Sequence, residues 1–284
     1  MNDGTLSSLY AYGRRALEGS PCFCGDASVD AMALLAAASG MDRERLLAEM
    51  RSAPGDGVAE RYRSFVRRRA DGEPFAYITG EREFMSLPFY VERGCLVPRP
   101  ETELLVEHAL GLGLSGDSRV LDMCSGGGCI AVSVAFHAPG CLVAASDVSG
   151  RAVALAKRNA ERNGVSDRIE FFCGDLFDPL PAGRKFDVIL SNPPYIGVGE
   201  EVQDSVRKYE PFEALFSDDD GMALTGRIVG EAPLWLSPGG VLAVEINSSR
   251  GAAVSELFRA SGFSDVSVKR DYSGLDRIVS GFYK

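Results

Sequence analysis

The sequence has few histidines and no long hydrophobic run. Its histidines, His108 and His137, are not spaced as metal ligands, and Cys22 and Cys24 form a lone close pair among seven cysteines. We therefore expect reduced thiols and no metal site. The most apolar early segment, residues 31–38, is too short to cross a bilayer, and the first ten residues lack a basic stretch followed by an apolar one. These absences predict a cytoplasmic protein without membrane contact.

The sequence also has fewer basic residues than acidic ones, 30 against 40. The formal net charge of −10 opposes non-specific binding to the phosphate backbone of nucleic acids. We therefore expect a protein partner and no direct contact with nucleic acid. Hydrophobic residues make up 45% of the 284 and charged residues 25%, which is typical of a globular chain and excludes extensive disorder. The length favours one main domain with a smaller companion, and we expect a monomer.

Helical signals dominate residues 1–75, which we interpret as a small helical domain that docks the substrate. Apolar runs open near Asp30 and Asp42, and residues 59–70 mix apolar and basic side chains. Residues 76–100 are rich in aromatic residues and proline, which predicts a β-hairpin linker. The arginines of the last helix form either a solvated face or a docking surface for an acidic partner: Arg61, Arg63, Arg67, Arg68 and Arg69.

Apolar strand-like runs alternate with amphipathic helices over residues 101–284. This alternation predicts an α/β domain with a mostly parallel sheet covered on both faces. A short connection between the last two strands favours an antiparallel hairpin at the sheet edge. The expected strands are residues 118–123, 141–147, 168–173, 186–192, 240–246, 265–270 and 277–283.

A glycine-rich loop follows the first of these strands. Residues 122–128, DMCSGGG, lead from strand to helix, where glycines let a ligand approach the backbone. The next strand ends at Asp147, whose carboxylate can accept hydrogen bonds from both ribose hydroxyls of a nucleotide. The pattern predicts a nucleotide-like cofactor. It leaves NAD possible, because Gly126, Gly128 and Ala131 also fit a dinucleotide-binding loop.

The loop after the third strand offers a second contact to such a cofactor. Asp175 can bond the amino group of an adenine, and Leu176 can pack against its ring.

The segment after the fourth strand, NPPY at residues 192–195, is the most informative feature of the chain. Pro193 and Pro194 fix the backbone and leave carbonyl oxygens as acceptors, while Asn192 adds a side-chain oxygen. Two such acceptors can hold an NH2 group with its nitrogen lone pair aimed at a methyl donor, and Tyr195 can stack on a flat amide or base. We therefore predict methyl transfer to an amide or amino nitrogen without a general base.

Several motifs together resemble the HemK/PrmC protein-glutamine N5-methyltransferases over nearly the whole chain. That family has an N-terminal helical domain, a β-hairpin linker and a seven-stranded Rossmann-like class I methyltransferase domain. The resemblance implies transfer of a methyl group from S-adenosylmethionine, with S-adenosylhomocysteine as product, to the glutamine of the GGQ motif of class I peptide chain release factors. The motifs are DGEP at 71–74, YITG at 77–80, LVPRPETE at 96–103 and NPPY at 192–195.

The resemblance also implies roles for individual residues. Asn192, Pro193, Pro194 and Tyr195 would hold the substrate glutamine and orient it for transfer. Arg99 and Glu101, with Glu103, either start the following helix or shape the substrate side of the cleft. The residues expected to bind the cofactor are Cys124, Ser125, Gly126, Gly127, Gly128, Asp147, Asp175, Leu176 and Asn192.

Departures from the family pattern leave more than one function open. Cys124, Ser125 and Gly127 replace parts of a loop that is often GTGTG, and Asn247 stands where glycine is common. A sister family that methylates a glutamine of a large-subunit ribosomal protein shares NPPY, although residues 99–103 favour the release-factor branch. An adenine-N6 nucleic-acid methyltransferase, an NAD-linked oxidoreductase and a catalytically silent adaptor each fit part of the sequence as well.

Overall fold

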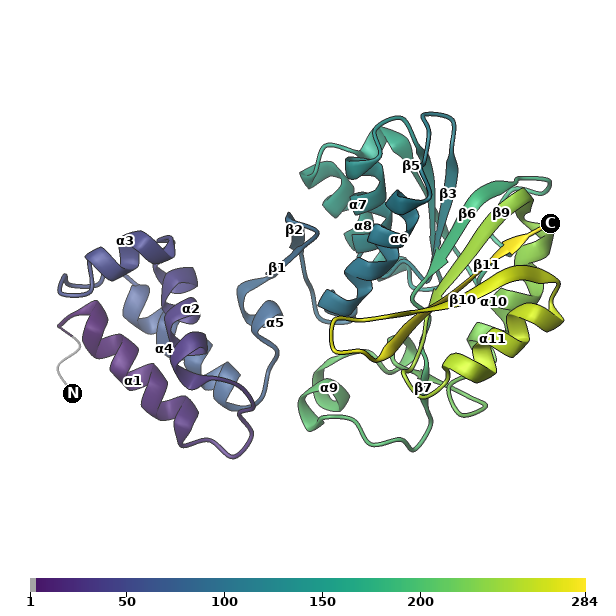
Figure 1. Cartoon of the computed structure of the whole chain (residues 1–284). Helices are drawn as coiled ribbons and strands as arrows, with labels where there is room; N and C mark the ends of the chain where they lie inside the picture. The colour runs from purple at the N-terminus through teal and green to yellow at the C-terminus, as the bar shows by residue number, and fades with distance from the viewer. Residues whose placement is uncertain (1–3) are drawn as a thin grey trace. The chain divides into compact units, whose positions relative to one another are not determined.

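The computed structural model describes residues 4–284 and divides them into two compact units (Figure 1). One comprises residues 4–80 with 202–209, and the other comprises residues 81–201 with 210–284. Residues 1–3 of the expected first domain lie outside the described residues. The segment 202–209 was expected in the second domain. Its grouping with the first unit depends on contacts between distant parts of the chain, which the order of elements does not show.

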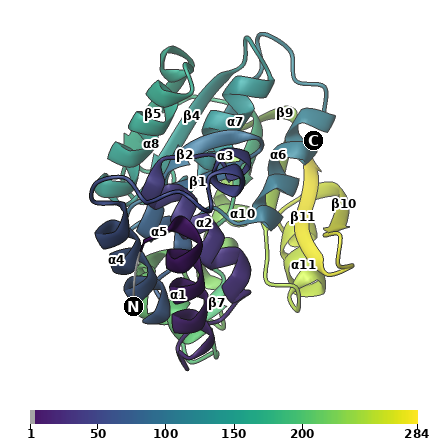
Figure 2. The same cartoon turned by 90° about the vertical axis from the view of Figure 1, so that its left-hand side faces the viewer.

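The first unit is a bundle in which α1, α2 and α4 pack against one another, as Figures 1 and 2 show. Polar caps begin its helices: Thr5 forms a capping box with Ser8, and Asp26 and Asp42 accept backbone hydrogen bonds at the next two helix starts. The helices are α1 (Leu6–Glu18), α2 (Ala27–Ser39), α3 (Arg43–Ala48), α4 (Val58–Ala70), α5 (Phe75–Thr79) and α9 (Asp204–Tyr209). Because α5 lies between Pro74 and a left-handed Gly80, the start of the expected linker is helical.

Some of the arginines proposed as a docking surface have partners within this unit. Arg68 donates to Glu73, whose side chain is 2% exposed, at 2.8 and 2.7 Å. Arg69 pairs with Asp30 at 2.6 Å, and Arg61 donates to the Ala38 carbonyl at 2.9 Å. These three arginines therefore stabilise the bundle.

The second unit begins with an antiparallel hairpin of β1 (Glu81–Phe84) and β2 (Leu87–Tyr90), the hairpin expected in this region. A seven-stranded sheet follows, in the order β10-β11-β9-β6-β3-β4-β5. Its central pairs are parallel, and β11 is antiparallel to both of its neighbours, as expected for the terminal hairpin. The strands are β3 (Arg119–Met123), β4 (Leu142–Asp147), β5 (Ile169–Cys173), β6 (Phe186–Ser191), β9 (Leu236–Glu245), β10 (Phe263–Arg270) and β11 (Asp276–Tyr283).

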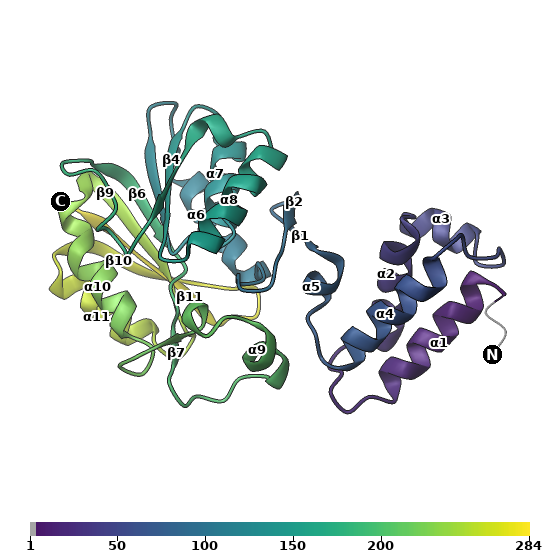
Figure 3. The same cartoon turned by 180° about the vertical axis from the view of Figure 1, so that it is seen from behind.

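Helices cover both faces of this sheet (Figures 1 and 3). One core contains side chains of α6 (Glu103–Gly111), α7 (Cys129–His137) and α8 (Gly150–Arg162). The other contains side chains of α10 (Ala223–Glu231) and α11 (Gly251–Ala260). The three-layer α/β Rossmann-like arrangement is therefore confirmed, and it brings the carboxyl ends of β3, β4 and β6 to one edge, where such sheets bind ligands.

The remaining elements are short. Two-residue strands β7 (Ile196–Gly197) and β8 (Phe216–Ser217) pair in parallel just after NPPY. The single-turn 3-10 helices within residues 4–284 are η1 (Pro100–Thr102), η2 (Ser166–Arg168), η3 (Phe212–Ala214) and η4 (Ala232–Leu234). Among the described residues, no helix has the length and apolar character that a membrane span needs.

Candidate active site

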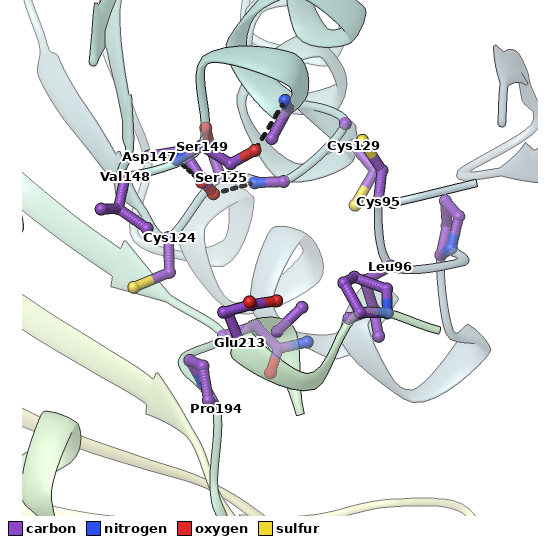
Figure 4. A pocket seen from close by; sticks show the side chains of 18 of the residues that line it. Cys95, Leu96, Cys124, Ser125, Cys129, Asp147, Val148, Ser149, Pro194 and Glu213 are labelled. Carbon is purple, nitrogen blue, oxygen red and sulfur yellow. Dashed lines mark hydrogen bonds between the residues drawn. The ribbon is translucent and has the colours of Figure 1, made fainter. Parts of the chain in front are cut away.

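A cavity of about 500 Å³ opens at the carboxyl ends of β3, β4 and β6 (Figure 4). This volume lies within the range of small-molecule sites. Figure 4 shows Cys124, Asp147 and Val148 on one side of it and Pro194 and Glu213 on the other. Of the residues expected from the sequence, those lining the cavity are Arg99, Cys124, Ser125, Gly126, Gly127, Asp147, Asn192 and Pro194.

The glycine loop has an unusual backbone. Cys124 has a φ of 61°, although it is not a glycine, and Gly126 and Gly128 have φ values of 54° and 80°. A side chain at Gly128 would meet the Cβ of Ala156 at 2.8 Å, so this position must be glycine for α7 to approach α8. Left-handed residues other than glycine concentrate at ligand sites, which agrees with the position of Cys124 in the cavity wall.

Asp147 is the last residue of β4, and its carboxylate faces the glycine loop. The backbone N–H of Gly126 donates to Oδ2 and that of Ser149 donates to Oδ1, each at 2.8 Å. Burial raises the pKa of Asp147, and these two hydrogen bonds oppose that rise. Each oxygen retains a lone pair, so the carboxylate can still accept hydrogen bonds from a diol in the cavity.

Asp175 and Leu176 line a smaller cavity of about 80 Å³ instead. It shares Cys124, Asp147 and Val148 with the main one, so the two are neighbours. Asp175 is paired with Arg227 at 2.9 Å.

The NPPY segment leaves β6 with its side chains in distinct surroundings. Asn192 lines the cavity, and its Nδ2 donates to the hydroxyl of Thr102 at 3.0 Å. Pro193 is buried. Tyr195 is absent from the cavity lining, and its hydroxyl donates to Oε1 of Glu245 at 3.2 Å. The sequence predicted Asn192 and Tyr195 but not their two partners.

Glu245 is a carboxylate buried at the end of β9, with 1% of its surface exposed. Burial raises its pKa to about 7, and the hydrogen bond that the Tyr195 hydroxyl donates to Oε1 opposes the rise. Thr102 is itself 2% exposed. Two polar pairs, Asn192 with Thr102 and Tyr195 with Glu245, therefore lie behind the cavity wall.

Arg99 and Glu101 lie in different places. Arg99 lines the main cavity, and its guanidinium pairs at 2.6 Å with Glu210, whose side chain is 1% exposed. Glu210 also accepts a hydrogen bond from the backbone of Val97 at 3.2 Å. Glu101 is exposed and lines a separate cavity with Glu103. Arg99 therefore stabilises the cavity wall, and Glu101 is outside that wall.

Sequence reasoning missed four buried polar residues near the site: Thr102, Asn159, Glu210 and Glu245. Asn159 Oδ1 accepts from the backbone N–H of Tyr90 at 2.7 Å, and its Nδ2 donates to the carbonyl of Gly127 at 2.9 Å. It thereby ties the hairpin to the glycine loop. The available signal was a polar residue within an apolar stretch: Glu245 lies inside the run GVLAVEI, and Asn159 lies among the alanines of α8.

No group of three or more His, Cys, Asp or Glu side chains within residues 4–284 is arranged to hold a metal ion. The seven cysteines are free thiols.

Known proteins similar to this chain share both units. Residues 100–209 match the "Methyltransferase small domain" family, and residues 8–80 match the "PrmC N-terminal domain" family. The release factor glutamine methyltransferase of Salmonella typhimurium is 41% identical over 254 residues, covering 89% of this chain and 91% of the relative. The protein of the same name from Geobacter sulfurreducens is 42% identical, covering 87% of each chain.

A solved structure supports the fold. The T. thermophilus 16S rRNA N2 methyltransferase, in complex with AdoMet and guanosine, has a TM-score of 0.56 and 19% identity, covering 72% of this chain and 50% of that one. At this identity the likeness concerns the fold alone. The relatives are far more similar and span nearly the full length, and on that basis this chain belongs to the release factor glutamine methyltransferase family.

Proposed function

We propose that the protein transfers a methyl group from S-adenosylmethionine to the side-chain nitrogen of the GGQ glutamine in class I release factors. The observation that supports this proposal most directly is the orientation of the Asn192 side chain. Its Nδ2 donates a hydrogen bond to the Thr102 hydroxyl. Its Oδ1 is therefore the atom that can accept a hydrogen bond from a substrate NH2 group. Family membership supports glutamine as the acceptor.

The cavity suits the proposed cofactor. Asp147 would accept hydrogen bonds from the ribose hydroxyls, and Val148, which is 66% exposed, offers an apolar surface to the adenine. Cys124 and the glycines bring backbone groups to the cavity, where polar parts of the cofactor would bind. When bound, S-adenosylmethionine supplies an electrophilic methyl group on a sulfonium.

The acceptor amide would be activated by orientation. Asn192 Oδ1 and a backbone carbonyl of residues 192–194 would each accept one hydrogen of the glutamine NH2 group, which turns its nitrogen toward the methyl donor. Removing a proton beforehand from an amide is costly, so this arrangement needs no general base before transfer. The positive charge that develops on nitrogen strengthens both hydrogen bonds in the transition state.

The thiols around the cavity remain neutral. Burial raises the pKa of the Cys95 thiol to about 11 and raises those of Cys124 and Cys129 as well. Since the thiolate is the nucleophilic form, these side chains do not compete with the substrate nitrogen for the methyl group.

The test measures transfer of labelled methyl from S-adenosylmethionine to purified release factor. Parallel reactions contain a release factor with Gln→Ala in its GGQ motif, a large-subunit ribosomal protein, and duplex DNA. We expect label on the wild-type release factor alone. Label on the ribosomal protein or DNA instead would overturn the substrate assignment while keeping the chemistry. No label in any reaction, together with no binding of S-adenosylhomocysteine, would overturn the proposal as a whole.

The helical residues 1–75 are proposed to dock the release factor. Deleting them should raise the KM for the intact factor more than the KM for a short GGQ peptide, provided that the shortened protein retains S-adenosylhomocysteine binding. Equal changes in both KM values would contradict the docking role.

A further inference from the structure

We propose that Glu213 is a further cofactor-binding residue, whose carboxylate accepts a hydrogen bond from the amino group of the cofactor's adenine. The inference rests on the proposed function, because it takes S-adenosylmethionine as the cofactor. It deepens that function by identifying the residue that selects adenine over other bases. Glu213 lies on η3, outside the glycine loop and the NPPY segment.

The two neighbouring cavities meet at Glu213. This residue lines both the main cavity of about 500 Å³ and the smaller one of about 80 Å³. Of the residues that line both cavities, Asp147 and Glu213 carry carboxylates, and Figure 4 shows them on opposite sides of the main cavity. Since Asp147 would hold the ribose, the base attached to that ribose would occupy the space between these two residues and extend into the smaller cavity.

The smaller cavity suits one edge of a flat base. Side chains of Leu176, Pro194 and Leu224 contribute apolar surface to its wall, and Leu176 is 5% exposed. A ring packed against these side chains excludes water, and the amino group of adenine then needs an acceptor from the protein. A hydrogen bond that is shielded from water in this way is electrostatically stronger than an exposed one.

Asp175, the acceptor expected from the sequence, already has a partner. Nη1 and Nη2 of Arg227 donate to its Oδ1 and Oδ2 at 3.3 and 2.9 Å. Both carboxylate oxygens therefore face the guanidinium on α10. The Asp175 side chain is also 49% exposed, so water competes for its remaining lone pairs. Asp175 is therefore the less suitable acceptor for adenine.

Glu213, by contrast, forms no hydrogen bond or ion pair with any of residues 4–284. The arginines that line the main cavity are engaged elsewhere: Arg99 pairs with Glu210 at 2.6 Å, and Arg151 donates to the carbonyl of Arg93 at 3.1 Å. The carboxylate of Glu213 can therefore accept hydrogen bonds from a ligand without first breaking an interaction within the protein.

The segment that carries Glu213 is anchored on both sides. Glu210, three residues earlier, is buried and pairs with Arg99. Leu215, two residues later, accepts a backbone hydrogen bond at 3.0 Å from Ile196, the residue that follows NPPY. Because η3 is held in place before the cofactor binds, little conformational entropy is lost when Glu213 makes its contact.

Binding calorimetry with two ligands tests the assignment. One ligand is S-adenosylhomocysteine, and the other carries purine in place of adenine, so that only the amino group is missing. In the wild type, the purine analogue should bind at least about tenfold more weakly, because it leaves the Glu213 carboxylate without a donor. In Glu213→Ala, the Kd values of the two ligands should lie within about threefold of each other.

Two further variants serve as controls. Glu213→Gln keeps a neutral side-chain oxygen and should give a Kd ratio between those of the wild type and Glu213→Ala. Asp175→Ala removes the other exposed carboxylate that lines the smaller cavity and should keep the wild-type ratio. Because Glu213 is exposed and has no partner within residues 4–284, its substitution should leave the Tm close to that of the wild type.

Three results would overturn the assignment. The first is a wild-type Kd ratio close to one. The second is a Glu213→Ala variant that keeps the wild-type ratio, which includes the case in which it weakens both ligands equally. The third is a ratio that falls to one in Asp175→Ala and not in Glu213→Ala, which would return the adenine contact to Asp175.

These Kd ratios do not depend on the methyl acceptor. If they behave as expected and no release factor is labelled, the substrate assignment fails while the role of Glu213 stands. If the wild type binds neither ligand, S-adenosylmethionine is not the cofactor, and both the proposed function and the role of Glu213 fail.

Discussion

Asp147 Oδ2 accepts a hydrogen bond at 2.8 Å from the backbone N–H of Gly126, a residue 21 positions earlier in the chain. The other carboxylate oxygen of Asp147, Oδ1, accepts a hydrogen bond from the backbone N–H of Ser149, also at 2.8 Å. One carboxylate thus holds the glycine loop at one oxygen and the start of α8 at the other. Under the proposed function, loop conformation and cofactor binding would be coupled through this side chain.

Asp147→Asn should weaken cofactor binding. The substituted amide has one acceptor oxygen, so its NH2 group must face one of the two backbone N–H donors, and it has less capacity for a ribose diol. Hydrogen bonds to charged groups contribute about 1.5–3 kcal/mol, which predicts an increase in Kd of roughly 10- to 150-fold. Titration calorimetry with S-adenosylhomocysteine measures this Kd for the variant and the wild type.

Asp187→Asn is the matched control for this prediction. Asp187 also accepts a backbone hydrogen bond, from Arg119 at 2.8 Å, but it lies near the opposite ends of β6 and β3. Its substitution should leave the Kd of S-adenosylhomocysteine within twofold. An Asp147→Asn variant that bound as tightly as this control would contradict the ribose role of Asp147.

Asn192→Ala should remove methyl transfer and leave cofactor binding largely intact. The substitution deletes the acceptor Oδ1 and leaves Asp147 and the glycine loop unchanged, so we expect kcat to fall at least about 100-fold with little change in cofactor Kd. Single-turnover transfer of labelled methyl measures the rate of the chemical step, and calorimetry measures the cofactor Kd. Asn163→Ala, at the end of α8, serves as a control that should keep full activity. Wild-type turnover by Asn192→Ala would refute the mechanism.

Much of the second unit could be predicted because its strands are short apolar runs with glycine or polar residues at their ends. The apolar runs in the sequence predict that Asp147 and Asn192 lie at strand ends. In the structure β4 ends at Asp147, and β6 ends just before Asn192. In a parallel sheet, strand ends gather at one edge, so even a single sequence indicates which loops form the site.

The partners of those side chains could not be predicted in the same way. In the sequence, Thr102 lies at an expected helix start and Glu245 lies in an apolar strand. Only the tertiary structure brings these two residues to NPPY. Residues 202–209 are mostly polar and include the short helix α9, whose Lys208 and Tyr209 donate to the carbonyl of Asp71. No local pattern predicts a backbone carbonyl as a partner so far away in the chain.

The ion pair between Arg99 and Glu210 should contribute to stability. Removing Arg99 leaves a nearly fully buried carboxylate without its counter-charge, and breaking a buried pair costs about 3–5 kcal/mol. Because Arg99 is 33% exposed, water replaces part of the interaction, and we expect Arg99→Met to cost about 2–3 kcal/mol. The double variant Arg99→Met/Glu210→Gln should recover part of this loss. Thermal unfolding of the single and double variants measures both effects.

An exposed pair provides the comparison. Arg45 and Glu49 lie 2.9 Å apart with side chains 63% and 36% exposed. Because water screens such an exposed pair, Arg45→Gln should leave the Tm close to that of the wild type. If Arg99→Met were as mild as Arg45→Gln, the pair with Glu210 would be stabilising neither the cavity wall nor the fold.

Asp122 should make stability depend on pH. It is fully buried at the end of β3, where Oδ2 accepts from the backbone N–H of Ala131 at 3.0 Å, and burial raises its pKa from 3.8 to about 8. A group whose pKa is higher in the folded state stabilises the fold fully below its unfolded pKa, and this contribution is lost as pH rises through the folded pKa. The wild type should therefore lose stability relative to Asp122→Asn as pH rises from about 4 to about 8, the interval between the unfolded and folded pKa values.

The measurement is the difference in Tm between Asp122→Asn and wild type at several pH values. Each pKa unit corresponds to about 1.4 kcal/mol, so the difference should shift by at least a few degrees in favour of the variant as pH rises. Ser133→Ala removes a buried side-chain oxygen that does not titrate, and its Tm difference should stay constant over the same range. A constant difference for Asp122→Asn as well would mean that the pKa of this carboxyl is not raised in the folded state, and would contradict the prediction.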